Sequence, residues 1–526
     1  MTEFYDKYSV HQILSKPVKF FGQPKTRDKI DVLNSLKSYA DLSDIKYVYP
    51  LVFDKNTELA ATAAKTVIEV MMKIQGKQWN TVYEEVKYTK VDLESMVNLL
   101  NFPQDISIHL LGVASLNSNG YVREEALRLI SGARVSSAIP YILLRLNDWV
   151  LPVRELAECI LKNTLTADNI DIFIDNAYLV NKLQNVLRVD LKNTRQEIIE
   201  YLKNESLKDK IKNGLKNPQV KTRLFCYMLL IDRIALEEDV ISSALKDKCF
   251  EIRMWLIEAI KILEPDKRNS IIGKLLEDKS AKVKTAVLRQ YEDIVCLMFR
   301  ERLKKLVVDE HSSIRDEARF ITKKHSFIKD FPEFYRQQIL DKPVPGALTG
   351  LGETGNKSDF VIVSRFCTDE NPKLRLAAMI AMWYLSKEDA VKHVLDSLDS
   401  DVPKIRKTAK QFLKSSKMPS VLFEMKVKLM GDNLDIQLFA LDAIYEYGGW
   451  QALESIMFAI TNEHGVVLEK AKNLLNRWLI RSASLYTKPD GATGSKIAEL
   501  FETIRNKELI PNYTFRQLQF VMETRR

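Results

Sequence analysis

The sequence predicts an all-α fold, a right-handed α-solenoid (superhelix) of stacked antiparallel helix pairs. Three observations predict it: glycine and proline are scarce, an apolar–basic residue pair recurs every 31 residues, and two further residue types keep step with that pair. The 526 residues include only 17 glycines and 16 prolines, a composition that favours helices over strands. With 46% apolar and 28% charged residues, the chain can bury a sizeable core.

The apolar–basic pair marks the second helix of each predicted unit. Val122-Arg123 is followed 31 residues later by Val153-Arg154, and the interval recurs along the chain at Ile252-Arg253, Val283-Lys284 and Ile314-Arg315, then at Leu374-Arg375, Ile405-Arg406 and, with the basic residue lost, Ile436-Gln437. Thr222-Arg223 lies 30 residues before Arg253. The segment DKPVPGALTGLGETGN, with Pro345 near its helix start, fills the double interval before Arg375.

Two companion positions explain the unit physically. Five residues before the apolar member stands an acid or amide, and four residues after it a small residue, as in Asp309 and Ala318 around Ile314. We expect the Asp or Asn to lie in the turn between two helices and to cap the second. The alanine shares a helix face with the apolar residue and lets the partner helix approach closely. One pair cannot bury its apolar face alone, so the units must stack.

The pattern resembles a known repeat family. An outline of VRxxAxxxLxxxGxxxAxPxL is matched by Val122, Arg123, Ala126, Ile130, Gly132, Ala138, Pro140 and Ile142, and parts of it return in ALTGLGETG and EYGGWQALESI. This is similar to the HEAT-repeat superfamily, and most closely to its short, phycobilisome-lyase-type repeats. The resemblance covers roughly residues 105–480. It implies the solenoid fold and is weak for function, since one fold serves many roles.

Composition and turn signals divide the chain into four segments. We expect an N-terminal capping arm at 1–30, broken by Pro17 and Pro24, and N-terminal helical pairs with an irregular insert at 31–104. The repeat array follows at 105–480, and after the loop TKPDGATGS a C-terminal helical cap spans 481–526. The register of residues 76–104 and 160–215 stays open.

Motifs for chemistry are missing from the sequence. The five cysteines are widely spaced, the six histidines form no HxxxH pair, and GLGETGNK has Asn356 where a phosphate loop needs lysine. We therefore expect no catalytic residue, cofactor, metal or small-molecule substrate. With no long apolar run and no secretory signal, we expect no membrane partner and a cytoplasmic location.

The repeated arginines allow two interpretations. They could form an anion-binding stripe. Alternatively, each could pair with an acid or a turn amide of its own or the next repeat, which is the role that the resemblance to HEAT repeats implies. We assign this structural role to Arg123, Arg154, Arg253, Arg315 and Arg375.

Positive charge is unevenly spread in a chain of net charge +9. Residues 203–324 hold 27 lysines and arginines against 20 acidic residues, and four lysines near residue 410 recur at spacings of three, four and three, on one helix face. An exposed lysine face is most often merely solvated. As a candidate binding surface we select Lys282, Lys284, Arg289, Arg406, Lys407, Lys410, Lys414 and Lys417.

Three functions remain in competition. The first is a non-catalytic scaffold or adaptor that binds a protein partner with an acidic surface along its curved face. The second is a nucleic-acid-binding HEAT-like protein of a DNA repair or defence type, glycosylase-like, with a basic concave surface. The third, suggested only by the name of the repeat, is a chromophore lyase, and no residue points to it.

Overall fold

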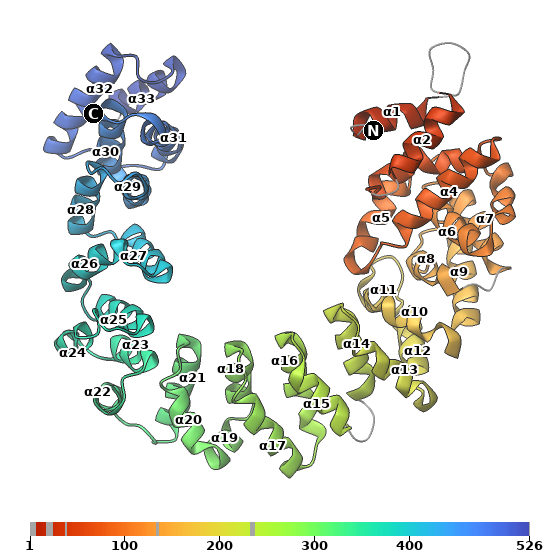
Figure 1. Cartoon of the computed structure of the whole chain (residues 1–526), viewed down its shortest axis with the longest axis horizontal. Helices are drawn as coiled ribbons and strands as arrows, with labels where there is room; N and C mark the ends of the chain where they lie inside the picture. The colour runs from red at the N-terminus through yellow and green to blue at the C-terminus, as the bar shows by residue number, and fades with distance from the viewer. Residues whose placement is uncertain (1–6, 17–24, 37–38, 133–135, 232–236, 525–526) are drawn as a thin grey trace. The chain divides into compact units, whose positions relative to one another are not determined.

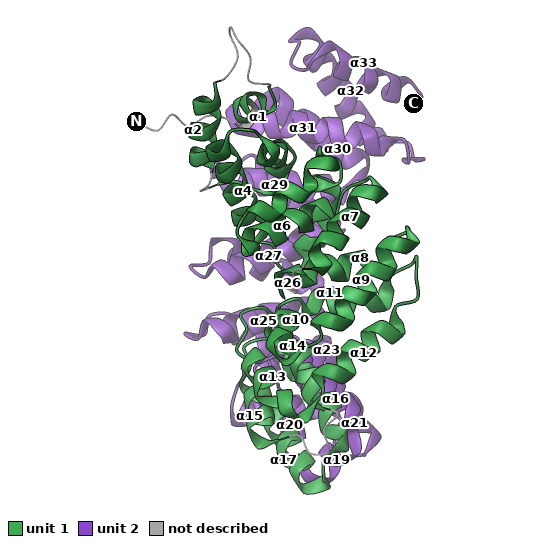
Figure 2. Cartoon of the chain, turned by 90° about the vertical axis from the view of Figure 1, so that its right-hand side faces the viewer, with its two compact units in different colours: residues 1–275 green, residues 276–526 purple. Residues whose placement is uncertain are grey.

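The computed structural model describes residues 7–16, 25–36, 39–132, 136–231 and 237–524. Pro17 and Pro24 lie outside these residues. The described residues form α-helices, short 3₁₀ segments and turns, with no β-strand among them, so the predicted all-α class is confirmed. The helices group into two compact units, residues 1–275 and 276–526, which Figure 2 shows in green and purple. Among the described residues no helix is both long and apolar enough to cross a membrane.

Unit 1 begins with short helices and continues as helix pairs. Pairs such as α6 with α7, α8 with α9, α13 with α14 and α15 with α16 pack against each other, and second helices of successive pairs also touch. Residues 76–104 form α5 and a 3₁₀ segment at Glu94–Asn101, and residues 160–215 contain the short helices α10 to α13. The helices are α1 Lys7–Ser15, α2 Thr26–Leu36, α3 Ile45–Val48, α4 Thr57–Met71, α5 Trp79–Val86, α6 Gln104–Ala114, α7 Gly120–Ser131, α8 Ile139–Arg145, α9 Leu151–Thr164, α10 Ile170–Asp175, α11 Ala177–Lys182, α12 Lys192–Leu202, α13 Lys208–Gly214, α14 Val220–Ile231, α15 Glu238–Lys246, α16 Phe250–Ala259 and α17 Pro265–Leu275.

Unit 2 is the more regular array. Its helices are α18 Ala281–Gln290, α19 Glu292–Met298, α20 Arg300–Leu306, α21 Ser312–Lys324, α22 Phe331–Asp341, α23 Pro345–Thr354, α24 Phe360–Ser364, α25 Pro372–Leu385, α26 Lys387–Asp396, α27 Pro403–Ser415, α28 Pro419–Leu429, α29 Leu434–Tyr447, α30 Gly449–Asn462, α31 Gly465–Ser482, α32 Gly491–Asn506 and α33 Asn512–Thr524.

Two rows of helices run through unit 2. The ladder row, named for the arginines that it carries, consists of α18, α21, α23, α25, α27, α29, α31 and α33, each packed on the next. The partner row consists of α20, α22, α24, α26, α28, α30 and α32, and the first six pack on the ladder-row helix that follows them. Figure 1 shows α25, α27 and α29 on one side of this unit and α24, α26 and α28 on the other. The predicted stack of antiparallel pairs is confirmed.

The core lies between the two rows and follows the predicted periodicity. The small residue of the repeat is fully buried, as at Ala126, Ala318, Ala378 and Ala409. The apolar residue four positions earlier is also buried, with Ile314 at 0% exposure. Because these residues share one helix face, the second helix of every pair presents a close-packing stripe to its partner.

The turn Asp or Asn acts one step earlier than we predicted. The Oδ1 atom of Asp369 accepts a hydrogen bond from the N–H of Asn371 at 2.8 Å, and Asn371 is the residue that caps α25. Asp54 holds Asn56 in the same way at the start of α4. The spacing that recurs between repeats therefore builds an Asx turn. This turn positions the N-cap residue, because the side chain reaches a backbone N–H two residues further along the chain.

The segment GLGETGNK has glycines at positions 352 and 355, and neither supplies a left-handed backbone conformation, since neither residue has a positive φ. Gly352 lies within α23, where an added Cβ would stand 2.5 Å from the Cα of Ala381 in α25. The glycine thus allows α23 and α25 to approach more closely than any side chain would permit.

Candidate binding surfaces

An arginine at the start of the second helix of a repeat can connect two turns, as Arg123 of α7 does. The Nε and Nη2 atoms of Arg123 donate to the two carboxylate oxygens of Asp148 at 2.9 Å each, and Nη1 donates to the carbonyls of Asn117 and Ser118. Asp148 belongs to the turn of the next repeat and also accepts from Arg145 at 2.8 Å. Both partners are buried, and the Trp149 ring covers the Arg123 guanidinium at 5.6 Å. This two-turn bridge leaves Arg123 no capacity for an external anion.

The same arrangement returns at other repeats. Arg223 binds Asp247 through two hydrogen bonds of 2.8 and 2.9 Å, Lys284 binds Asp309 at 2.6 Å, and Arg375 binds Asp401 at 3.0 Å. Five ladder arginines also use their Nη1 atom to donate a hydrogen bond to a backbone carbonyl of the turn that precedes their own helix: Arg154, Arg253, Arg315, Arg375 and Arg406. At Gln437, where the charge is lost, the side-chain amide donates to the Leu429 carbonyl and to Glu463 instead.

The turn carboxylates are held in their charged form. Burial alone would raise the pKa of Asp309, but hydrogen bonds from Lys284 and His311 outweigh it and lower that pKa. For Asp247 burial also opposes ionisation, and Arg223 reverses the effect, so its pKa is lowered as well. The contacts of Arg223 with Asp247 and of Lys284 with Asp309 are therefore ion pairs.

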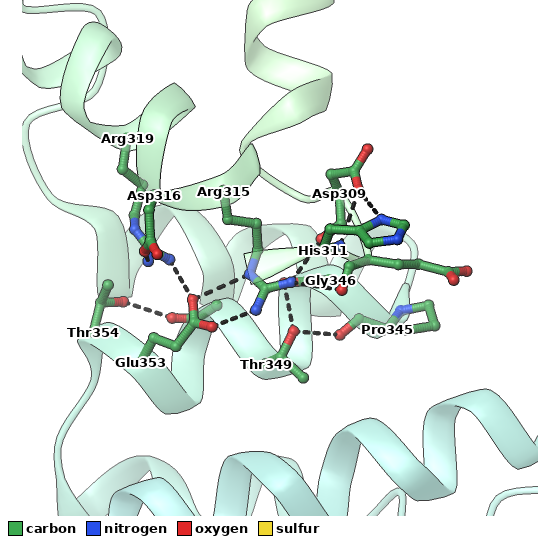
Figure 3. Close-up of polar contacts among 12 residues, drawn as sticks. Asp309, His311, Arg315, Asp316, Arg319, Pro345, Gly346, Thr349, Glu353 and Thr354 are labelled. Carbon is green, nitrogen blue, oxygen red and sulfur yellow. Dashed lines mark hydrogen bonds and ion pairs between the residues drawn. The ribbon is translucent and has the colours of Figure 1, made fainter. Parts of the chain in front are cut away.

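Arg315 has an acceptor that the repeat pattern does not contain. Its Nε atom donates to Oε2 of Glu353 at 3.1 Å and its Nη2 atom to Oε1 of the same carboxylate. Arg319 also donates to Glu353, at 2.6 Å, as Figure 3 shows. Glu353 lies near the end of α23, the glycine-rich helix, so the carboxylate comes from a helix end here and from a turn elsewhere.

The candidate residues on α18 differ in environment. Lys284 is a ladder residue, mostly buried. Arg289 is 69% exposed and its Nε atom lies 2.6 Å from Oε2 of Glu317 on α21. Lys282 is exposed. Lys284 and Arg289 are thus already paired with carboxylates of the same unit.

The candidate residues on and after α27 fall into two groups. Arg406 belongs to the ladder, Lys410 lies 5.4 Å above the Phe439 ring, and the Nζ atom of Lys417 donates to the Tyr447 carbonyl at 3.0 Å and to the Glu446 carbonyl. Lys407 and Lys414 make no hydrogen bond or ion pair with any described residue, and Lys407 is exposed. Together with exposed Lys404, at helical spacing, they form what we call the lysine face of α27.

The helices on either side of α27 present different chemistry. On α25, Tyr384 is 58% exposed and Leu376 and Ile380 are partly exposed, so this helix contributes apolar surface. On α29, Asp435 is exposed and Asp442 binds Lys470 at 2.8 Å, so that helix contributes acidic surface. The cations of α25, Lys373 and Arg375, are paired with Glu310 and Asp401, so among α25, α27 and α29 the described cations without a carboxylate partner lie on α27.

A trough lies on the partner row, where no sequence signature pointed. It has a volume of about 660 Å³ and is lined by α28, α30 and α32. Its apolar lining comes from Phe423, Val427 and Met430 on α28, which are 64%, 45% and 59% exposed, with Phe458 of α30 and Leu500 of α32. The signal available in the sequence was VLFEMKVKLM itself, which is apolar on two faces of one helix, beyond what core packing needs.

The charged groups of the trough are Lys426, Lys496, Lys507, Glu454 and Glu499. Glu454 is mostly buried between two of the lysines, 2.7 Å from Lys426 and 3.9 Å from Lys496. Lys507 is exposed and makes no ion pair with the described residues. The lining as a whole carries one more positive than negative charge.

Other residues with chemical potential are dispersed. Among the described residues, no three His, Cys, Asp or Glu side chains converge on a common metal position. All five cysteines are free thiols, and burial raises the pKa of Cys226 to about 12.

Comparison with known proteins adds likenesses of fold. No protein-family model matches the chain, and no curated protein matches it. Solved structures that align with it include a complex titled for Kap95p binding to RanGDP, at 11% identity and a TM-score of 0.30, covering 99% of this chain and 66% of that one. Yeast importin-β (Kap95p) aligns at 11% identity and TM-score 0.29, over 98% and 67% of the two chains. A homology model of the AP-3 complex aligns at 11% and 0.28, over 95% and 94%.

Proposed function

We propose that this chain is a non-catalytic scaffold of short HEAT-type repeats that binds a protein partner with an acidic surface. The observation that carries the proposal is the lysine face of α27. There the ammonium groups of Lys407 and Lys414 have no carboxylate partner among the residues that the structure describes, while ladder cations such as Arg123 and Lys284 have one. A cation without an internal partner is available for an external one at little desolvation cost.

The surroundings of the lysine face favour a folded acidic protein. The apolar surface of Leu376, Ile380 and Tyr384 on α25 lies on the adjacent ladder-row helix, so a partner can bury apolar area and make ion pairs together. The ladder holds successive helices in register, which keeps the surface preorganised.

The charge pattern argues against a nucleic acid as the ligand. A phosphate backbone needs a continuous positive track, and α29, the ladder-row helix next to α27, presents Asp435 and Asp442. In the basic block at 203–324, many cations are already paired, among them Lys212 with Glu237 and Asp239, and Arg302 with Glu277. Binding of a nucleic acid is therefore the alternative that the experiment below distinguishes from binding of a protein.

A cytoplasmic location belongs to the same proposal. Its support is the set of free thiols at all five cysteines, since unpaired cysteines are typical of reducing compartments.

The test is cross-linking of the full-length chain in lysate of its source organism, after nuclease treatment, followed by mass spectrometry. The double variant Lys407→Glu/Lys414→Glu is compared with Lys329→Glu/Lys342→Glu, which makes the same charge change at exposed positions elsewhere in unit 2. We expect a salt-sensitive protein partner, cross-linked to α27 through an acidic segment, that the first variant loses and the second retains. Retention by both variants would overturn the assignment to α27. Recovery of nucleic acid alone, lost steeply with salt, would replace the proposal by the nucleic-acid alternative.

A further inference from the structure

The trough on the partner row of unit 2 runs along its helices. On α28 the lining residues Phe423, Val427 and Met430 are spaced by four and three residues, as one face of a helix requires. On α32 the lining extends from Lys496 to Lys507, about 16 Å at 1.5 Å per residue. Since α28 and α30 both pack on α29, and α30 packs on α32, the trough is an elongated depression along three successive helices of the partner row.

Its exposure distinguishes the trough from a small-molecule pocket. Ligand pockets bury most of the surface of their ligand. Here the apolar side chains on α28 are about half exposed, so the trough is open to solvent along its length. A concentration of apolar surface of this kind on a soluble chain marks an interaction site.

We propose that this trough binds an amphipathic α-helix of a partner protein, with its apolar stripe on α28 and α30 and acidic residues toward Lys496 and Lys507 of α32. The proposal adds a second surface to the scaffold function and uses none of the residues of the lysine face.

The backbone chemistry of the site favours a helical occupant. An extended peptide gains affinity by pairing its backbone with a sheet edge, and the described residues contain no strand. A helix satisfies its own backbone groups and needs only a groove with apolar positions at matching spacing. About two to three helical turns fit the length of the lining.

Charge complementarity sets the polarity of the occupant. Glu454 is neutralised by Lys426 and Lys496, while Lys507 has no partner among the described residues. On and just after α32 the lining has Lys496 and Lys507 against one carboxylate, Glu499, so an acidic flank on the bound helix is attracted there and a basic flank repelled.

The experiment measures fluorescence anisotropy of a labelled synthetic peptide of about 14 residues with leucines at i, i+3, i+4 and i+7 and glutamates elsewhere. The full-length chain is titrated with this peptide, with a scrambled peptide of equal composition, and with a version carrying lysines for glutamates. We expect saturable binding of the first, at least about tenfold weaker binding of the other two, and about tenfold loss on Val427→Glu. Phe320→Glu, at a position 61% exposed elsewhere in unit 2, is the matched control and should bind as the parent does.

Lys507→Glu provides a readout that a folding defect cannot imitate. This substitution should weaken the binding of the glutamate peptide and strengthen the binding of the lysine peptide. Equal binding of ordered and scrambled peptides, or no effect of Val427→Glu, would overturn the proposal. Self-association of the chain that Val427→Glu abolishes would assign the trough to a second copy instead. Lys407→Glu/Lys414→Glu should leave peptide binding unchanged, so the two proposals fail independently.

Discussion

Arg123 and Asp148 face each other across adjacent repeats, joined by two parallel hydrogen bonds of 2.9 Å, and each side chain is only 1% exposed. Arg145 shares the same carboxylate, and burial lowers its pKa to about 10 despite Asp148. One buried carboxylate thus compensates two buried cations. Arg375 and Asp401 occupy equivalent positions, yet Asp401 is 82% exposed.

The first prediction compares these two aspartates. Asp148→Asn leaves Arg123 and Arg145 buried without a counter-charge and should lower the free energy of unfolding by about 3–5 kcal/mol. Asp401→Asn removes an exposed ion pair and should cost about 0–1 kcal/mol. Urea unfolding followed by circular dichroism measures both. Equal losses would show that the depth of burial does not govern the ladder.

The second prediction concerns the close approach of α23 and α25. In Gly352→Ala the new Cβ must displace the backbone at Ala381, so we expect a loss of about 1–3 kcal/mol. Gly494→Ala, inside α32 with nothing nearer than 3.5 Å, should be neutral or stabilising by about 0.5–1 kcal/mol. Thermal unfolding of the two variants is the measurement. A stable Gly352→Ala variant would mean that α23 can move away from α25 at little cost.

The third prediction is a loss of stability in acid. The pKa values of Asp247 and Asp309 are lowered below the ordinary value of 3.8 in the folded chain. Their stabilisation is therefore complete above that value and is lost as the pH falls through the folded pKa values. Asp309→Asn should retain the turn, because Asn217 holds Gln219 in the same way. It should shift the urea midpoint less on acidification than the parent chain does, and an unchanged acid dependence would exclude Asp309 as a contributor.

The fourth prediction separates two lysines that the sequence placed together. Lys417 donates to carbonyls of the last turn of α29, so Lys417→Met should destabilise that helix end by about 0.3–1 kcal/mol. Faster hydrogen exchange at the N–H of Gly448, which donates to the Ile444 carbonyl, reports the change locally. Lys407→Met should leave exchange at that site unaltered, and a comparable effect of the two variants would refute the distinction.

Periodic features were predictable from the sequence because each repeat states them again. The spacing of Arg123 and Arg154 placed both at the starts of second helices, and the alanines four residues after the apolar members located the core. The all-α class and the stacking of pairs followed from the same spacing. Features that recur at a fixed interval can be predicted from the sequence even when the contacts between repeats are unknown.

Features that occur once could not be derived in this way. Glu353 binds Arg315 from the end of a helix whose approach depends on glycines, and no repeat spacing relates these two residues. The trough escaped because partner-row helices carry no signature, and the exposed face of α28 differs from its buried face only in what packs against it. The spacing of Lys417 predicted that it shares a helix face with Lys407 and Lys414, but α27 ends at Ser415 and Lys417 lies beyond it.

The ladder also has a mechanical consequence. The bridges from Arg123 and Arg223 in unit 1, and from Lys284 and Arg375 in unit 2, each tie the start of a second helix to the turn of the next repeat. Bending that opens the repeats on the side away from these bridges leaves them intact. Stretching a unit along its stack, in contrast, breaks the ion pair of each repeat that has one, so resistance to stretching is the property most sensitive to the loss of a single aspartate.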